Sequence, residues 1–137
     1  MRLIAAMVKH TIETAPANIA ARVNSQALFN CSVNAGQDFV TWDYDPLNPD
    51  ASVRIYTSTD GRVEDGQEDK FDIERDGQDG VHNLVIKSVQ MGLAARYCCG
   101  LATDGMSKCA HLVAVGMTTR NCAILLCHLI YRITVYI

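Results

Sequence analysis

The fold is decided by the stretch Arg96-Tyr97-Cys98-Cys99-Gly100, read together with two residues that lie far before it. Cys31 precedes Cys99 by 68 residues, and Trp42 follows Cys31 by 11 residues. Tyr97 stands two residues before Cys99. Each of these residues is common alone. All four at these spacings, inside sequence typical of strands, indicate a β structure built around one central cluster.

The sequence on both sides of this stretch reads as short strands separated by turns. Apolar and polar residues alternate, as they do in strands that bury one face, and turn residues recur at intervals of roughly 8–12 residues. The predicted strands lie at 19–23, 27–31, 39–42, 53–56, 71–73, 84–86, 97–99 and 112–115. The pair at 71–73 and 84–86 is predicted to form a hairpin. This pattern, without helical periodicity, predicts an all-β sandwich of two antiparallel sheets.

The stretch from about Pro16 to Val115 resembles a variable-type (V-set) domain of the immunoglobulin superfamily. Besides the four residues above, the resemblance rests on Val40-Thr41-Trp42, Ile55-Tyr56, Lys70-Phe71-Asp72-Ile73, Asn83-Leu84-Val85-Ile86 and Ala95-Arg96-Tyr97-Cys98-Cys99-Gly100. It implies a Greek-key immunoglobulin-like sandwich of the V type. The run Arg96–Leu101 looks closer to receptor ectodomains, such as the variable domains of the polymeric immunoglobulin receptor, than to antibodies.

The same resemblance implies how the centre of the domain is held. A disulfide between Cys31 and Cys99 would join the two sheets, Trp42 would pack against it, and Tyr97 would pin the corner that leads into its strand. In the chain-entropy description, a disulfide that closes so long a loop stabilises the fold by about 4 kcal/mol.

Three positions depart from the family's pattern. Leu93 stands where an aspartate usually pairs with a basic residue, so Lys70 lacks its expected partner. Asn24 replaces a glycine at a turn, where asparagine can still adopt a left-handed backbone. No Phe/Trp-Gly-x-Gly motif follows the loop at 103–105, so the bulge with which antibody variable domains pair is not expected.

Four further cysteines remain, namely Cys98, Cys109, Cys122 and Cys127. Cys98 is the neighbour of Cys99 on a strand, so it faces the other side of the sheet and cannot join the central bridge. We prefer a second disulfide from Cys98 to Cys109, across the base of the loop between them. Two free or unrelated thiols are the alternative. Structural zinc sites use tighter Cys-x₂₋₄-Cys pairs than the one from Cys122 to Cys127, so no metal is expected.

The segment 60–79 is strongly acidic, with nine carboxylates against three basic residues. A solvated sheet edge that resists aggregation is the expected role. A weak calcium site that begins at Asp72, or a footprint for a basic partner, is the alternative. A calcium loop would need a glutamate at its twelfth position, which is Asn83 here. The net charge of −3 argues against nucleic-acid binding.

No set of residues forms a recognisable catalytic motif, so the chain is expected to be a non-enzyme without cofactors. We expect extracellular recognition of a protein or carbohydrate ligand, through loops that a rigid scaffold displays at one end. The candidate binding residues are Asn34, Gln37, Ser58, Asp60, Thr103, Asp104 and Met106. The alternative is a cell-adhesion module that pairs homophilically or in cis. It would use a sheet face carrying Phe39, Tyr44 and Tyr56.

Disulfides require an oxidising compartment, so the chain is expected to be secreted or displayed at the cell surface. The sequon Asn30-Cys31-Ser32 makes Asn30 a candidate glycosylation site. Within 137 residues, we expect an N-terminal arm or remnant signal at 1–11 and the V-type domain at 12–116. An apolar tail follows at 117–137, a candidate truncated membrane anchor, although Arg132 interrupts it.

Overall fold

A computed structural model of the chain describes residues 11–34, 39–46, 51–77, 80–102 and 105–116. In chain order its strands are β1 (Ile12–Thr14), β2 (Ile19–Arg22), β3 (Ala27–Phe29), β4 (Ser32–Val33), β5 (Val40–Asp45), β6 (Val53–Thr57), β7 (Arg62–Val63), β8 (Phe71–Glu74), β9 (Asn83–Ile86), β10 (Arg96–Leu101) and β11 (Met106–Val115). One turn of 3₁₀ helix, η1 (Met91–Leu93), precedes β10. The chain is therefore all-β, as predicted.

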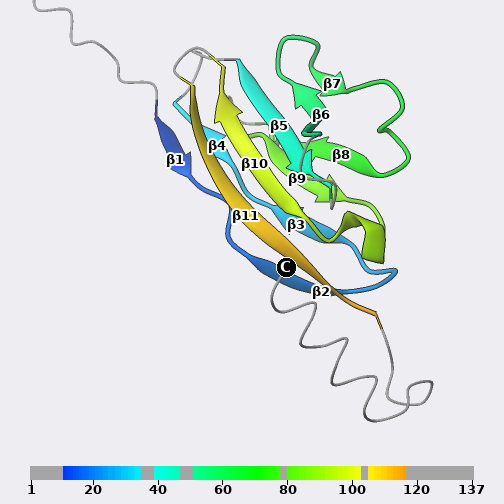
Figure 1. Cartoon of the computed structure of the whole chain (residues 1–137). Helices are drawn as coiled ribbons and strands as arrows, with labels where there is room; N and C mark the ends of the chain where they lie inside the picture. Colours follow the sequence, from blue (N-terminus) through cyan, green and yellow to red (C-terminus); the bar gives the residue numbers. More distant parts are fainter. Residues whose placement is uncertain (1–10, 35–38, 47–50, 78–79, 103–104, 117–137) are drawn as a thin grey trace, which may run out of the picture.

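The strands form two layers that pack face to face (Figure 1). The larger sheet has the order β2-β11-β10-β5-β6-β7, and the smaller has the order β3-β9-β8. Strand β1 pairs with β4, whereas β2 runs parallel to β11 in the larger sheet. The chain therefore changes its pairing between β1 and β2. It does so at Pro16, which has no N–H to donate to a sheet and is tolerated at such an edge.

The core lies between the two sheets, and in β3, β10 and β11 it is supplied by alternate residues. In β3 the two flanking residues are buried and the central one is exposed. The predicted hairpin is confirmed as β8 and β9, which pair antiparallel from Phe71 opposite Ile86 to Glu74 opposite Asn83. The largest fully buried side chains are Trp42, Tyr56, Tyr97, Phe29 and Phe71. Burying each such side chain contributes about 1.5–3 kcal/mol before the entropy of ordering is subtracted.

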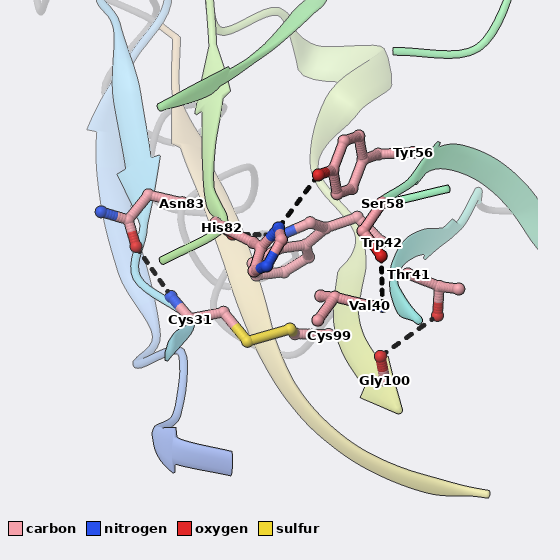
Figure 2. The surroundings of a disulfide bond; sticks show 10 residues. All are labelled: Cys31, Val40, Thr41, Trp42, Tyr56, Ser58, His82, Asn83, Cys99 and Gly100. Atoms are coloured by element: carbon pink, nitrogen blue, oxygen red, sulfur yellow. Dashed lines mark hydrogen bonds between the residues drawn. A yellow bond between two sulfur atoms is a disulfide. The ribbon is translucent and has the colours of Figure 1, made fainter. Parts of the chain in front are cut away.

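A disulfide joins the two layers at the centre of this core (Figure 2). It links Cys31 to Cys99, and neither residue is exposed to solvent. Trp42 lies directly opposite Cys99 on the neighbouring strand β5, and its indole N–H donates a 2.7 Å hydrogen bond to the carbonyl of His82. The backbone N–H of Cys31, between β3 and β4, donates to Oδ1 of Asn83 at 3.0 Å. Cys31, Trp42, His82 and Asn83 therefore connect both sheets around one bridge.

Tyr97 fixes the corner that leads into β10. Its hydroxyl donates a 2.7 Å hydrogen bond to the carbonyl oxygen of Leu93, the last residue of η1. Burial raises the pKa of Tyr97, and the neighbouring Tyr44 raises it further, so the hydroxyl stays protonated and remains a donor. The side chain of Leu93 is itself buried, in place of the carboxylate that the family usually has there.

The other two departures from the family's pattern are also visible. Asn24 has a φ of 69°, so it adopts the left-handed conformation that asparagine tolerates in place of the usual glycine. The register between β10 and β11 runs without a break from Arg96 opposite His111 to Leu101 opposite Met106. The described, paired residues of this hairpin therefore contain no antibody-type bulge.

Replacing Tyr97 with phenylalanine removes only the hydroxyl that bonds to Leu93. We expect the free energy of unfolding to fall by about 1–3 kcal/mol, because a buried carbonyl loses its donor. Urea denaturation followed by tryptophan fluorescence measures the change. Tyr44→Phe is the matched control, since the Tyr44 hydroxyl has no hydrogen-bond partner among the described residues. An equal loss in both variants would contradict the role of the Tyr97 hydroxyl.

Candidate binding surface

Three of the predicted loop segments meet at one end of the larger sheet. Val40 begins β5, and it lies opposite Leu101, at the end of β10. Its N–H donates to the hydroxyl oxygen of Ser58 at 2.9 Å, and the N–H of Ser58 donates back to the carbonyl of Val40 at 2.9 Å. The N–H of Ala102 donates to the carbonyl of Phe39 at 2.9 Å. The chain segments before β5, after β6 and after β10 are thus held side by side.

The candidate binding residues that the structure describes differ in their hydrogen bonds and in their exposure to solvent. Oδ1 of Asn34 accepts hydrogen bonds from the N–H of Thr11 at 3.3 Å and from its hydroxyl at 2.7 Å. Asp60 is exposed and accepts a 3.2 Å bond from the hydroxyl of Thr57. Met106, the first residue of β11, is exposed. The remaining candidates, Gln37, Thr103 and Asp104, lie outside the described residues.

The outer face of the larger sheet carries a shallow concavity of about 540 Å³ across β10, β5 and β6. Two ion pairs lie in its walls. Arg54 forms an ion pair with Asp43, and Arg96 holds Oδ2 of Asp45 with both its Nη2, at 2.7 Å, and its Nε, at 2.9 Å. This surface was not among the features predicted from the sequence. The signal was present in β5, where polar side chains occupy every second position from Thr41 to Asp45.

Gly100 keeps the floor of the concavity open. A Cβ added at this position would lie 3.1 Å from the hydroxyl oxygen of Thr41 and 3.4 Å from the carbonyl oxygen of Met106. The contact with Thr41 is tighter than ordinary van der Waals packing. Any larger side chain at residue 100 would therefore push against its neighbours and fill the hollow between β10 and β5.

A second disulfide lies on this outer face and confirms the preferred pairing of Cys98 with Cys109. The two residues are directly opposite each other in the β10–β11 ladder, with Cα atoms 4.0 Å apart. Cys98 is half-buried and lines the concavity, whereas Cys109 is exposed. Cys122 and Cys127 lie outside the described residues.

The adhesion hypothesis placed Tyr44 and Tyr56 on an exposed sheet face, and that placement is wrong. Tyr44 is 7% exposed and Tyr56 is fully buried. Tyr44 is two residues after Trp42 on β5, so strand alternation points both into the core. In β6, the register shifts opposite Trp42 and Asp43, and two consecutive residues, Ile55 and Tyr56, are buried as a result. Phe39, by contrast, is exposed.

Tyr56 instead belongs to a polar group inside the core. Its hydroxyl shares a 2.9 Å hydrogen bond with Nδ1 of His82 and accepts a 3.3 Å bond from Nη1 of Arg75. Burial raises the pKa of Tyr56, and the nearby Arg75 partly offsets this. The buried hydroxyl is thus satisfied by partners on two other segments.

The described residues hold neither a cluster of metal ligands nor a membrane-spanning helix. In the described ranges, no three His, Cys, Asp or Glu side chains are grouped as metal ligands would be. The candidate twelfth calcium position, Asn83, bonds instead to the backbone of Cys31. Nor does that part of the chain contain a helix with the length and apolar character needed to cross a membrane.

Neither a scan against protein-family models nor a search of curated proteins finds a match to this chain. Among solved structures, the first domain of Duf (Kirre) is similar to 80% of the chain, with a TM-score of 0.62 and 14% identity, over 99% of its own length. The Rst D1-D2 structure matches 78% of the chain with a TM-score of 0.61 and 19% identity, over 49% of its length. The titin I9-I11 tandem matches 79% with a TM-score of 0.58 and 20% identity.

These likenesses show the fold. The chain has the immunoglobulin-like sandwich that its cysteine, tryptophan and tyrosine spacing predicted. It spans about a third (34%) of the length of the titin tandem that it matches. The neighbours include the Kirre and Rst domains as well as titin domains, so the sandwich itself does not select among the functions that such folds carry.

The ion pairs on the outer face are expected to contribute little to stability. Arg54→Ala and Arg96→Ala should each change the free energy of unfolding by less than about 1 kcal/mol, because exposed ion pairs are screened by water. Urea denaturation of the two variants beside the unchanged protein measures this. A loss above about 2 kcal/mol in either would show that the pair is structural rather than a feature of the surface.

Proposed function

We propose that this chain is an extracellular immunoglobulin-like domain of the V-set type, from a receptor or a soluble ectodomain, that recognises a protein ligand through the loops at one end. The observation that carries the proposal is the convergence of three loop segments on one hydrogen-bonded frame, formed by Phe39, Val40, Ser58 and Ala102. Function in such folds is commonly carried by loops on a rigid scaffold.

Two exposed apolar side chains at this end favour a protein as the ligand. Phe39 is 49% exposed and Met106 is 41% exposed. They lie near each other, because Ala102 bonds to the carbonyl of Phe39 while Leu101 pairs with Met106. Phe and Met are enriched where proteins contact one another, and charged residues are depleted there. A carbohydrate ligand is the alternative occupant of the same loops.

Two disulfides support an extracellular location. One bridge is buried between the sheets and the other lies on the surface, and disulfides persist mainly in oxidising compartments. The exposed Asn30 of the sequon is consistent with passage through the secretory pathway. The proposal includes attachment to a membrane through the apolar tail at 117–137. These residues lie outside the described part of the chain.

Homophilic adhesion is the second candidate, and the outer face favours it. Two arginine–aspartate pairs stand side by side on neighbouring strands, so two copies of this face could exchange partners across a contact. The first domain of Duf (Kirre) and the Rst D1-D2 structure are among the structural neighbours. Phe39 remains available at the edge of this face, whereas Tyr44 and Tyr56 do not.

Ligand binding through the loop end can be tested with labelled multimers of the protein on a panel of cells. Phe39→Asp and Met106→Asp should each reduce staining at least about tenfold, which corresponds to about 1.4 kcal/mol of binding energy. Leu28→Asp is the matched control, because Leu28 is 39% exposed on the outer side of the smaller sheet. Staining that is lost only in Leu28→Asp would contradict the proposal.

The same preparation distinguishes the alternatives. Removing glycans from the cells should leave staining intact for a protein ligand and abolish it for a carbohydrate. Homophilic pairing would appear as a concentration-dependent dimer in sedimentation. It would be lost in Arg54→Glu with Arg96→Glu, since like charges would then face one another.

Glycosylation of Asn30 gives a separate test of the location. Protein secreted from eukaryotic cells should lose mass on treatment with a peptide N-glycosidase, and Asn30→Gln should abolish that loss because it removes the acceptor amide. Mass spectrometry of the intact chain makes the comparison. Retention of the unglycosylated chain in the cytosol, with all cysteines reduced, would contradict an extracellular role.

A further inference from the structure

The two disulfides differ sharply in their access to solvent. Cys31 and Cys99 are 0% exposed and lie between the sheets behind Trp42. Cys98 lines the open concavity, and Cys109 is exposed at its side. Disulfide exchange requires a thiolate to reach one of the two sulfur atoms, so accessibility decides which bridge reacts. The outer bridge is open to such an approach and the inner one is not.

The fold also depends on the two bridges to different degrees. The inner disulfide joins two sheets and spans 68 residues. The outer disulfide spans 11 residues and links two strands that are already paired along their whole ladder, from Arg96 opposite His111 to Leu101 opposite Met106. The backbone hydrogen bonds of β10 and β11 therefore hold the strands together when the outer bridge is open.

We propose that Cys98–Cys109 is a thiol-exchange site that reacts with small monothiols of the glutathione class in the folded protein, while Cys31–Cys99 stays closed. This proposal is independent of the ligand binding proposed above. Exposed disulfides are the labile ones in proteins, and here an exposed bridge lies beside a buried one on the same strand.

The exchange proceeds in two balanced steps. A thiolate attacks Sγ of Cys109, the more exposed residue, and forms a mixed disulfide while the Cys98 thiolate leaves and takes up a proton. A second thiolate then attacks the sulfur of the bound small thiol. That step releases the oxidised dimer of the small thiol and leaves Cys109 as a thiol. Two external thiols are oxidised and one protein disulfide is reduced.

Opening the bridge changes the support of the candidate binding loop. Cys98 and Cys109 lie three rungs of the ladder from Leu101 and Met106, where the loop between β10 and β11 begins. With the covalent tie removed, the pairs closest to the loop are held by hydrogen bonds alone. Amide hydrogen exchange at Met106 and Ser107 should therefore become faster in the reduced protein, while exchange in β9 stays unchanged.

The test uses the full chain with Cys122→Ser and Cys127→Ser, so that no thiol outside the described residues takes part. The folded, oxidised protein is incubated with increasing reduced glutathione without denaturant, then alkylated and mapped by mass spectrometry. We expect a glutathione adduct on Cys109 and alkylated Cys98 at glutathione concentrations at least about tenfold below those that expose Cys31 or Cys99.

Two controls make the result decisive. The same protein in denaturant should lose both disulfides, which shows that the reagents are competent. A variant with Cys98→Ser and Cys109→Ser should show no labelling over the same glutathione range and should still unfold cooperatively. The proposal is overturned if all four cysteines react together, or if the outer bridge stays oxidised until the protein unfolds. Either result leaves the ligand-binding proposal intact.

Discussion

The rest of the structure depends on the disulfide that joins the two sheets at their centre. Cys31 comes from the smaller layer and Cys99 from the larger. The polar groups around the bridge are hydrogen-bonded to one another. Asn83 accepts the N–H of Cys31 where the strand is interrupted, and Trp42 reaches from the opposite layer to the carbonyl of His82. Removing this bridge would leave a small domain whose layers are held by apolar burial and by hydrogen bonds such as that from Trp42 to His82.

Strand alternation gives β10 two roles at once. Tyr97, Cys99 and Leu101 point inward and build the core, while the intervening residues, Arg96, Cys98 and Gly100, build the outer face. Two adjacent cysteines therefore serve two bridges in different surroundings. The inner bridge is a structural constraint. The outer one lies on the candidate surface, at the base of the loop where recognition is proposed.

Much of the fold could be predicted because its signals are local. Strand alternation accounts for the hairpin of β8 and β9 and for the inward-pointing side chains of Tyr97 and Cys99. Turn chemistry accounts for the left-handed backbone of Asn24. The prediction that Tyr56 is exposed was wrong, because the burial of Tyr56 depends on a register shift between β5 and β6. Such a shift arises from pairing over a distance and leaves no period in the sequence.

The sequence by itself determined the sandwich and the side of the strand on which Cys98 lies, because a period of two encodes them. The inner disulfide followed from the resemblance that the spacing of Cys31, Trp42, Tyr97 and Cys99 carries. Only the tertiary structure decided the rest. It brought Arg54 and Arg96 to their aspartates, left the concavity open at Gly100, and set Phe39 beside the β10–β11 loop. The physical reason is that strand order and register join segments far apart in the chain. Which side chains then share a surface depends on the fold.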